Sequence, residues 1–217
     1  MNVLHVCANP KPTEESVSKQ LAAAFFGKII ELCPDVELTN VDLYEEKPPF
    51  YTYELYKRAW RPLTDESYEP SKPEEMAMNY ARRQAELFNA ADVLVLTMPM
   101  WNFSVPGVMK TWIDQVLTPG LTFEIDSETK EVKPLHRIKS VVLLVASGSA
   151  YKEGDERDAL TGLIRTAFGF AGIDAVEVAW AEGQGPLSFG DGEANKQMAL
   201  EAAVEIAEDV AELESDE

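Results

Sequence analysis

Residues that commonly build metal and nucleophilic sites are scarce in this sequence. Its 217 residues include 2 cysteines and 2 histidines. Cys7 and Cys33 have neither the spacing of a metal-ligand pair nor that of a redox pair, so we interpret them as free structural thiols in a reducing cytoplasm. His5 lies within an apolar run and His136 within a polar stretch. The sequence therefore predicts no metal site and no catalytic triad.

Long apolar runs and basic residues are also lacking. No run approaches the ~20 apolar residues of a membrane-spanning helix, and the first residues show no signal peptide. Lys and Arg number 19 against 38 Asp and Glu, giving a net charge of −19. Such a surface repels nucleic acid and anionic membranes, so we expect neither as a partner. Much of the charge lies in the last helix and in an expected disordered acidic tail at 214–217. We interpret it as a solvated face; a salt-adapted host is the alternative.

Strand and helix patterns alternate along the chain. Strands are predicted at 2–8, 35–43, 92–98, 140–147 and 174–181, and helices at 16–33, 72–91, 105–116, 156–170 and 191–213. Continuous apolar strands between helices predict a parallel sheet that is covered on both faces. Five strands in this rhythm favour an α/β three-layer sandwich with the flavodoxin-like order 2-1-3-4-5.

Two stretches interrupt this rhythm within a single predicted domain at 1–213. Residues 44–71 are rich in aromatic residues and proline, which is typical of an ordered insertion. This insertion is either a surface cap over the sheet edge, or a substrate lid or subunit interface. Residues 121–135 alternate around the turn-like DSET and predict a small hairpin.

The loop after the first strand is a candidate anion site. Ligands of an open α/β sheet bind beyond the carboxyl ends of its strands. Ser16 and Ser18 stand at the start of a predicted helix, whose unpaired N–H groups attract an anion. Glu14 and Glu15 oppose an anion, although nearby lysines offset them. The serines therefore predict either a phosphate site or an ordinary helix cap.

The loop after the third strand, within TMPMWNFSVP, is a candidate site for a flat ring. We expect Ser104 to cap a helix that has Pro106 in its first turn. Trp101 and Phe103 then offer apolar faces on either side of Asn102, with exposed backbone between them. This combination suits a planar heterocycle with a polar edge; the alternative is aromatic packing at the sheet end.

The loop after the fourth strand, ASGSAY, offers a third contact region. Gly148 lets the backbone approach a ligand closely, and Tyr151 could donate a hydrogen bond to a carbonyl. The alternative is a simple Gly-Ser turn that leads into the next helix. Taken together, the three loops describe flavin mononucleotide (FMN), with its phosphate at the first helix and its ring between the other two loops.

Four segments resemble the FMN-dependent NADH-azoreductase family of flavodoxin-like quinone reductases. They are PMWNFSVPGVMKTWIDQVLTPGLTF, SVSKQL, ASGSAY and FGFAGIDAVEVAWAEG, of which PMWNF is the most specific. The resemblance covers nearly the whole chain, although Ser149 replaces a glycine that is common in the family. It implies phosphate contacts from Asn9, Ser16, Val17 and Ser18, and ring contacts from Met100, Trp101, Asn102, Phe103, Ala146, Ser147, Gly148 and Ser149.

The resemblance also implies an activity. The family transfers hydride from a nicotinamide to the flavin, and then to a quinone or azo compound, by a ping-pong mechanism. It implies a cytoplasmic homodimer with sites at the subunit interface. No arginine cluster lies near the three loops, which favours NADH over NADPH. Tyr151 is the one candidate catalytic residue. The alternatives are a flavodoxin-type electron carrier and a cofactor-free scaffold.

Overall fold

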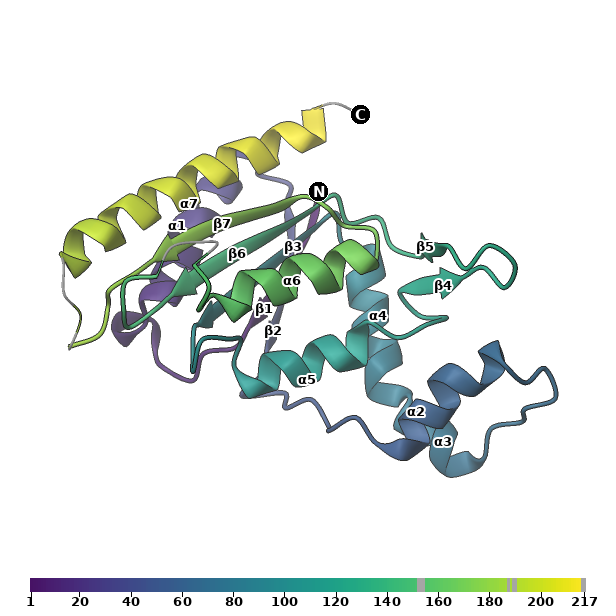
Figure 1. Cartoon of the computed structure of the whole chain (residues 1–217). Helices are drawn as coiled ribbons and strands as arrows, with labels where there is room; N and C mark the ends of the chain where they lie inside the picture. Colours follow the sequence, from purple (N-terminus) through teal and green to yellow (C-terminus); the bar gives the residue numbers. More distant parts are fainter. Residues whose placement is uncertain (152–154, 187, 189–190, 216–217) are drawn as a thin grey trace.

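A five-stranded parallel sheet forms the centre of the molecule (Figure 1). The computed structural model describes residues 1–151, 155–186, 188 and 191–215. Within them the strands are β1 (Asn2–Cys7), β2 (Glu37–Asp42), β3 (Val93–Pro99), β6 (Ser140–Ala146) and β7 (Val176–Ala181), in the spatial order β2-β1-β3-β6-β7. The predicted order 2-1-3-4-5 is confirmed.

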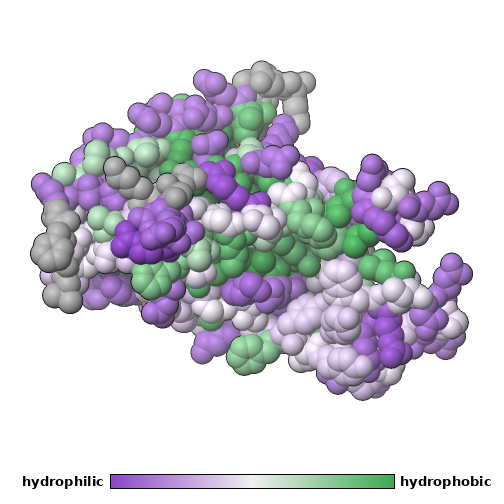
Figure 2. Space-filling view, in the orientation of Figure 1, coloured by the Kyte–Doolittle hydropathy of each residue, from purple (hydrophilic) through white to green (hydrophobic). Residues whose placement is uncertain are grey.

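Helices cover both faces of this sheet, as predicted. Helices α1 (Val17–Leu32) and α7 (Gly192–Ser215) pack together on one face, and α4 (Asn79–Ala90), α5 (Gly107–Val116) and α6 (Ala159–Phe170) cover the other. Successive strand residues serve opposite faces: Leu94 joins the α4–α5–α6 core, whereas Val95 joins the α1–α7 core. Hydrophilic side chains dominate the outer rim over α7 (Figure 2).

The helix predicted at 72–91 is divided at Met78. Helix α3 (Lys72–Ala77) begins with a capping box in which Ser71 and Glu74 satisfy each other's backbone N–H groups, and α4 starts directly after Met78. The N–H of Met78 donates to Glu75 O at 3.3 Å, a tighter turn than the α-helical one. The predicted single helix is therefore wrong at this residue.

The two interrupting stretches both contain regular structure. Residues 44–71 contain α2 (Tyr53–Trp60) and the short η2 (Arg61–Leu63), and α2 packs on α3 beyond the end of α4 (Figure 1). Ion pairs from Lys57 to Glu74 and from Arg58 to Glu75 join the two helices. Residues 121–135 contain the antiparallel pair β4 (Phe123–Ile125) and β5 (Val132–Pro134).

The end of the chain continues the last helix. Helix α7 runs to Ser215, so it includes part of the predicted tail at 214–217, and residues 216–217 lie outside the described residues. No helix in the described part of the chain is long and apolar enough to cross a membrane.

Candidate functional site

A pocket of about 340 Å³ lies at the carboxyl end of the sheet, where the loops after β1, β3, β6 and β7 meet. We call it the loop pocket. Its volume lies within the range of roughly 300–1,000 Å³ that is typical of small-molecule sites. Its position is the one that an open α/β sheet uses for ligands.

The loop pocket brings together most of the residues that the sequence nominated. The nominated residues that line it are Asn9, Ser16, Val17, Ser18, Met100, Trp101, Ala146, Ser147 and Gly148. Asn102, Phe103 and Ser149 are exposed neighbours of these residues and are not part of the lining. The three loops chosen from the sequence thus converge on one cavity.

At the β1 end, Asn9 orients two serine hydroxyls. Its Nδ2 donates to Ser16 Oγ at 2.7 Å and to Ser18 Oγ at 3.0 Å, while its Oδ1 accepts from the backbone N–H of Lys11 at 3.0 Å. Ser16 Oγ also accepts from Lys19 N at 3.2 Å. Both lone pairs of Ser16 Oγ are then engaged, so its O–H group is left to donate. All three polar side chains are buried, which makes this a donor arrangement suited to an anion.

Backbone donors extend this arrangement. Ser16 is the N-cap of α1, as the sequence allowed, and the first N–H groups of a helix, here those of Val17 and Ser18, have no intrahelical acceptor. The positive end of the helix dipole lies at the same place. Two exposed side chains of opposite charge, Lys11 and Glu15, also line the pocket. The local charge is therefore balanced, in contrast to the acidic surface of the whole chain.

At the β3 end, the chain reverses direction in a tight turn. Trp101 N donates to Ser104 O at 3.0 Å, and Ser104 N donates to Trp101 O at 3.1 Å. The two central residues, Asn102 (φ 47°) and Phe103 (φ 69°), both have positive φ, as in a type I′ turn. A left-handed conformation is unfavourable for a bulky residue such as phenylalanine, and strain of this kind is concentrated at functional sites.

The structure corrects the predicted role of Ser104 in this turn. Helix α5 begins at Gly107 with Pro106 at the N-cap position and no capping side chain, so Ser104 does not cap it. Ser104 instead closes the turn through its backbone. Trp101 keeps 43% of its surface exposed at the rim of the pocket.

Gly185 allows the β7 loop to touch the β6 loop at Gly148. Gly185 N donates to Gly148 O at 2.8 Å, and a Cβ on Gly185 would lie 2.8 Å from that oxygen. A side chain cannot be accommodated there without moving backbone. Ser147 is held in place by Trp180, whose Nε1 donates to Ser147 Oγ at 2.8 Å. This wall of the loop pocket is consequently built from backbone at close range.

The β7 loop was missed by the sequence reasoning. Gln184, Gly185 and Pro186 line the loop pocket together with Lys11, Glu15 and Pro99. The glycines and proline of GQGP directly after the fifth strand were the available signal, because β7 ends at the same edge of the sheet as β6.

The nominated catalytic residue, Tyr151, lies outside the loop pocket. Its ring meets Phe103 edge to face at a centroid distance of 5.7 Å, and the Arg157 guanidinium lies 4.7 Å from the centroid of the Tyr151 ring. Tyr151 lines a second pocket, at the edge of the sheet. Its catalytic role remains a prediction.

The titratable groups that the sequence set aside have structural partners. His5 contacts Asn40 and Thr97, and burial lowers the pKa of its ring. His136 contacts Ala171 O, and burial likewise lowers the pKa of His136. Burial raises the pKa of the Cys7 thiol, which disfavours the reactive thiolate. Within the described residues, no cluster of three or more His, Cys, Asp or Glu could hold a metal ion.

Comparison with known proteins agrees with this geometry. The profile of the Flavodoxin_2 family, described as a flavodoxin-like fold, matches residues 1–207. The chain belongs to this family. Within the flavodoxin-like fold, the loop pocket occupies the switch point of the strand order, where ligands of this fold bind.

Relatives and solved structures of similar length cover nearly the whole chain. The FMN-dependent NADH:quinone oxidoreductase of Gluconacetobacter diazotrophicus is 35% identical over 208 residues, covering 94% of this chain and 96% of that protein. The protein of the same name from Brevibacillus brevis is 32% identical over 209 residues, covering 95% and 98%. The crystal structure of azoreductase from Bacillus anthracis is 27% identical with a TM-score of 0.79, covering 97% and 98%.

Proposed function

We propose that this chain is an FMN-dependent oxidoreductase that passes electrons from NADH or NADPH to quinones or azo compounds. The observation that carries the proposal is the presence, in one pocket, of an anion site rich in donors and an aromatic residue from the turn after β3. Ser16, Ser18 and the start of α1 form the anion site, and Trp101 also lines the pocket.

The residues present fit the two ends of FMN. A phosphate presents acceptor oxygens, and it matches the Ser16 hydroxyl, whose two lone pairs are engaged by Asn9 Nδ2 and Lys19 N, and the Ser18 hydroxyl, which also accepts from Asn9 Nδ2. The isoalloxazine ring presents a flat apolar face and a polar edge, which match Trp101 and the backbone of Ala146–Gly148. Gly148 and Gly185 keep that backbone free of side chains.

FMN, when bound, supplies the redox chemistry by taking up a hydride from the nicotinamide and giving reducing equivalents to the acceptor. The chain's own residues would bind and orient the cofactor and keep water away from its ring. Asn9 holds Ser16 and Ser18 as donors, and the Trp101–Ser104 turn limits the position of the ring. Met100 is buried at the end of β3, so it supplies an apolar floor.

Four further assignments belong to this proposal. The names of the curated relatives support an enzyme over an electron carrier or a cofactor-free scaffold. A cytoplasmic homodimer suits the family resemblance and the two free cysteines. Asn102, Phe103 and Ser149 are proposed as additional ring contacts, since each adjoins a lining residue. NADH is the proposed donor.

The activity is tested with the purified chain, FMN, NADH and a benzoquinone. We expect NADH to be oxidised faster than by the same concentration of free FMN, with a parallel reaction for an azo dye that loses its colour. A rate no higher than that of free FMN would contradict the proposal. Anaerobic mixing with NADH separates the carrier alternative, because a carrier needs a separate reductase and its flavin absorbance would not bleach.

Glu15 is expected to oppose the phosphate, because its carboxylate lines the pocket at the same end. Glu15→Gln should tighten FMN binding by about two- to fivefold at low salt, and the gain should shrink at high salt, since exposed charges interact weakly and are screened. Calorimetric titration with FMN measures this. Glu14→Gln is the matched control, because Glu14 is exposed on the same short turn and does not line the pocket. Equal effects of the two variants would show that only the overall charge matters.

A further inference from the structure

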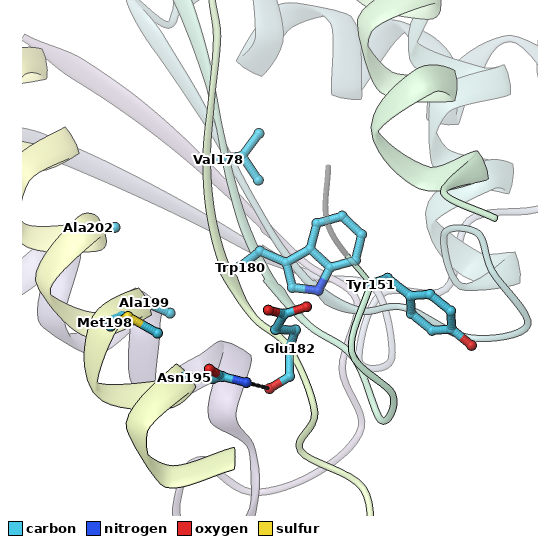
Figure 3. A pocket seen from close by; sticks show the side chains of 8 residues that line it. All are labelled: Tyr151, Val178, Trp180, Glu182, Asn195, Met198, Ala199 and Ala202. Carbon is cyan, nitrogen blue, oxygen red and sulfur yellow. Dashed lines mark hydrogen bonds between the residues drawn. The ribbon is translucent and has the colours of Figure 1, made fainter. Parts of the chain in front are cut away.

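A second pocket, of about 300 Å³, lies over the free edge of β7. We call it the edge pocket (Figure 3). Val178 and Trp180 from the strand, Glu182 from the loop that follows, and Met198 from α7 line it, with Tyr151 at the far side. The two pockets share no lining residue: Glu182 lines the edge pocket, whereas Gln184 and Gly185 line the loop pocket.

The charged side chain that lines the edge pocket is that of Glu182. Figure 3 shows the Glu182 carboxylate beside the Trp180 indole. Glu182 is half-buried, and within the described residues its carboxylate has no hydrogen-bond or ion-pair partner. Within the described residues this carboxylate is therefore left to pair with a cationic ligand from solution.

The position of Glu182 is fixed by its backbone. The carbonyl oxygen of Glu182 accepts from Gln184 Nε2 at 2.9 Å and from Asn195 Nδ2 at 3.3 Å. The loop is held further by Gly192, where a Cβ would lie 2.7 Å from Gly183 O. The carboxylate is thus presented by a braced loop next to α7.

The remaining walls are apolar and aromatic. Trp180 is half-buried against the α4–α5–α6 core, the bond from its Nε1 to Ser147 Oγ orients its ring, and the residue also lines the edge pocket. Ala199 and Ala202 of α7 add small apolar surface. An indole face next to a carboxylate is the combination that recognises ammonium groups, through cation–π attraction and an ion pair together.

We propose that the edge pocket binds an organic cation, an ammonium or quaternary ammonium group that carries an apolar or aromatic substituent. The ammonium group lies between Glu182 and the Trp180 ring, and the substituent packs on Val178 and the alanines of α7. The net charge of −19 attracts such ligands to the surface, and Glu182 selects this place among the many carboxylates. This proposal does not depend on FMN or on the proposed reaction.

The experiment is calorimetric titration of the full chain, saturated with FMN, with benzyltrimethylammonium and, separately, with benzyl alcohol. We expect saturable one-site binding of the cation and about tenfold weaker binding of the neutral alcohol. Glu182→Gln should weaken cation binding by about fivefold or more, whereas Glu177→Gln, an exposed position on the same strand, should change it by less than about twofold.

A second variant pair guards against misfolding. Met198 is 60% exposed on α7 and lines the pocket, so Met198→Lys introduces a competing ammonium group without disturbing the core. We expect this variant to abolish saturable binding, while Gln197→Lys, exposed and adjacent, should leave it intact. Equal losses in Glu182→Gln and Glu177→Gln, or equal affinities for the cation and the alcohol, would each overturn the proposal.

Discussion

Replacing Asn9 with aspartate is expected to weaken FMN binding by about 100-fold, equivalent to about 2.7 kcal/mol. Asn9 donates from Nδ2 to both serine hydroxyls, which leaves the Ser16 O–H group to donate, within 3.4 Å of Ser18 Oγ here and to a phosphate when one binds. A carboxylate of the same shape can only accept, so both hydroxyl protons would turn inward and their lone pairs would face the phosphate. It would also add a buried negative charge beside a dianion. The measurement is the dissociation constant of FMN, from quenching of flavin fluorescence.

The matched control for this change is Asn79→Asp. Asn79 is exposed at the start of α4 and does not line the loop pocket, so the same change of net charge should leave FMN affinity within about twofold of the original. Circular dichroism of both variants checks that the fold persists. Unaltered affinity in Asn9→Asp would mean that the serine pair does not hold the phosphate.

The Gly185→Ala substitution is expected to weaken FMN binding by about tenfold and to destabilise the chain by about 1–3 kcal/mol. The new Cβ would lie 2.8 Å from Gly148 O and 3.0 Å from Gly148 Cα, both backbone atoms that cannot rotate away. The β6 and β7 loops would have to separate, which would disrupt the bond from Gly185 N to Gly148 O. Thermal unfolding and FMN titration measure the two effects.

Gly162→Ala provides the control for this second change. Gly162 is exposed in the interior of α6, and a Cβ there meets no atom within 4 Å. Alanine is favoured over glycine in helices by about 1 kcal/mol, so this variant should be slightly more stable and should bind FMN normally. If both Gly185→Ala and Gly162→Ala lost FMN affinity, the loss would reflect general destabilisation of the fold and not the close contact between the β6 and β7 loops.

Much of the fold could be predicted because burial leaves a clear periodicity. The uninterrupted apolar runs at β3 and β6 are buried on both faces, and the alternation at β2 matches its place at the sheet edge. Once the strand order is known, the loops after β1, β3 and β6 must meet, which is why residues far apart in the sequence could be nominated together.

The details that escaped prediction depend on tertiary contacts. Asn102 and Phe103 adopt positive φ without the glycine that marks such turns, so the sequence favoured a helix cap at Ser104 instead. The contribution of Gln184 was missed because the segment GQGP is placed at the pocket by a tertiary contact, the bond from Gly185 N to Gly148 O. The direction of the Asn9 amide is set locally, by the bond from Lys11 N to Asn9 Oδ1, which has the pattern of an Asx turn.

The turn at Trp101–Ser104 also determines at which step, folding or ligand binding, its backbone entropy is lost. Its two left-handed residues are held by the Trp101–Ser104 bridge and by the bond from Ala159 N to Phe103 O at 3.0 Å. The backbone entropy of this segment is therefore lost when the chain folds, and little is left to lose when a ring binds. Preorganisation of this kind lowers the stability of the fold and raises the affinity for the ligand. Substitutions at Asn102 and Phe103 that make the chain more heat-resistant are therefore expected to weaken cofactor binding.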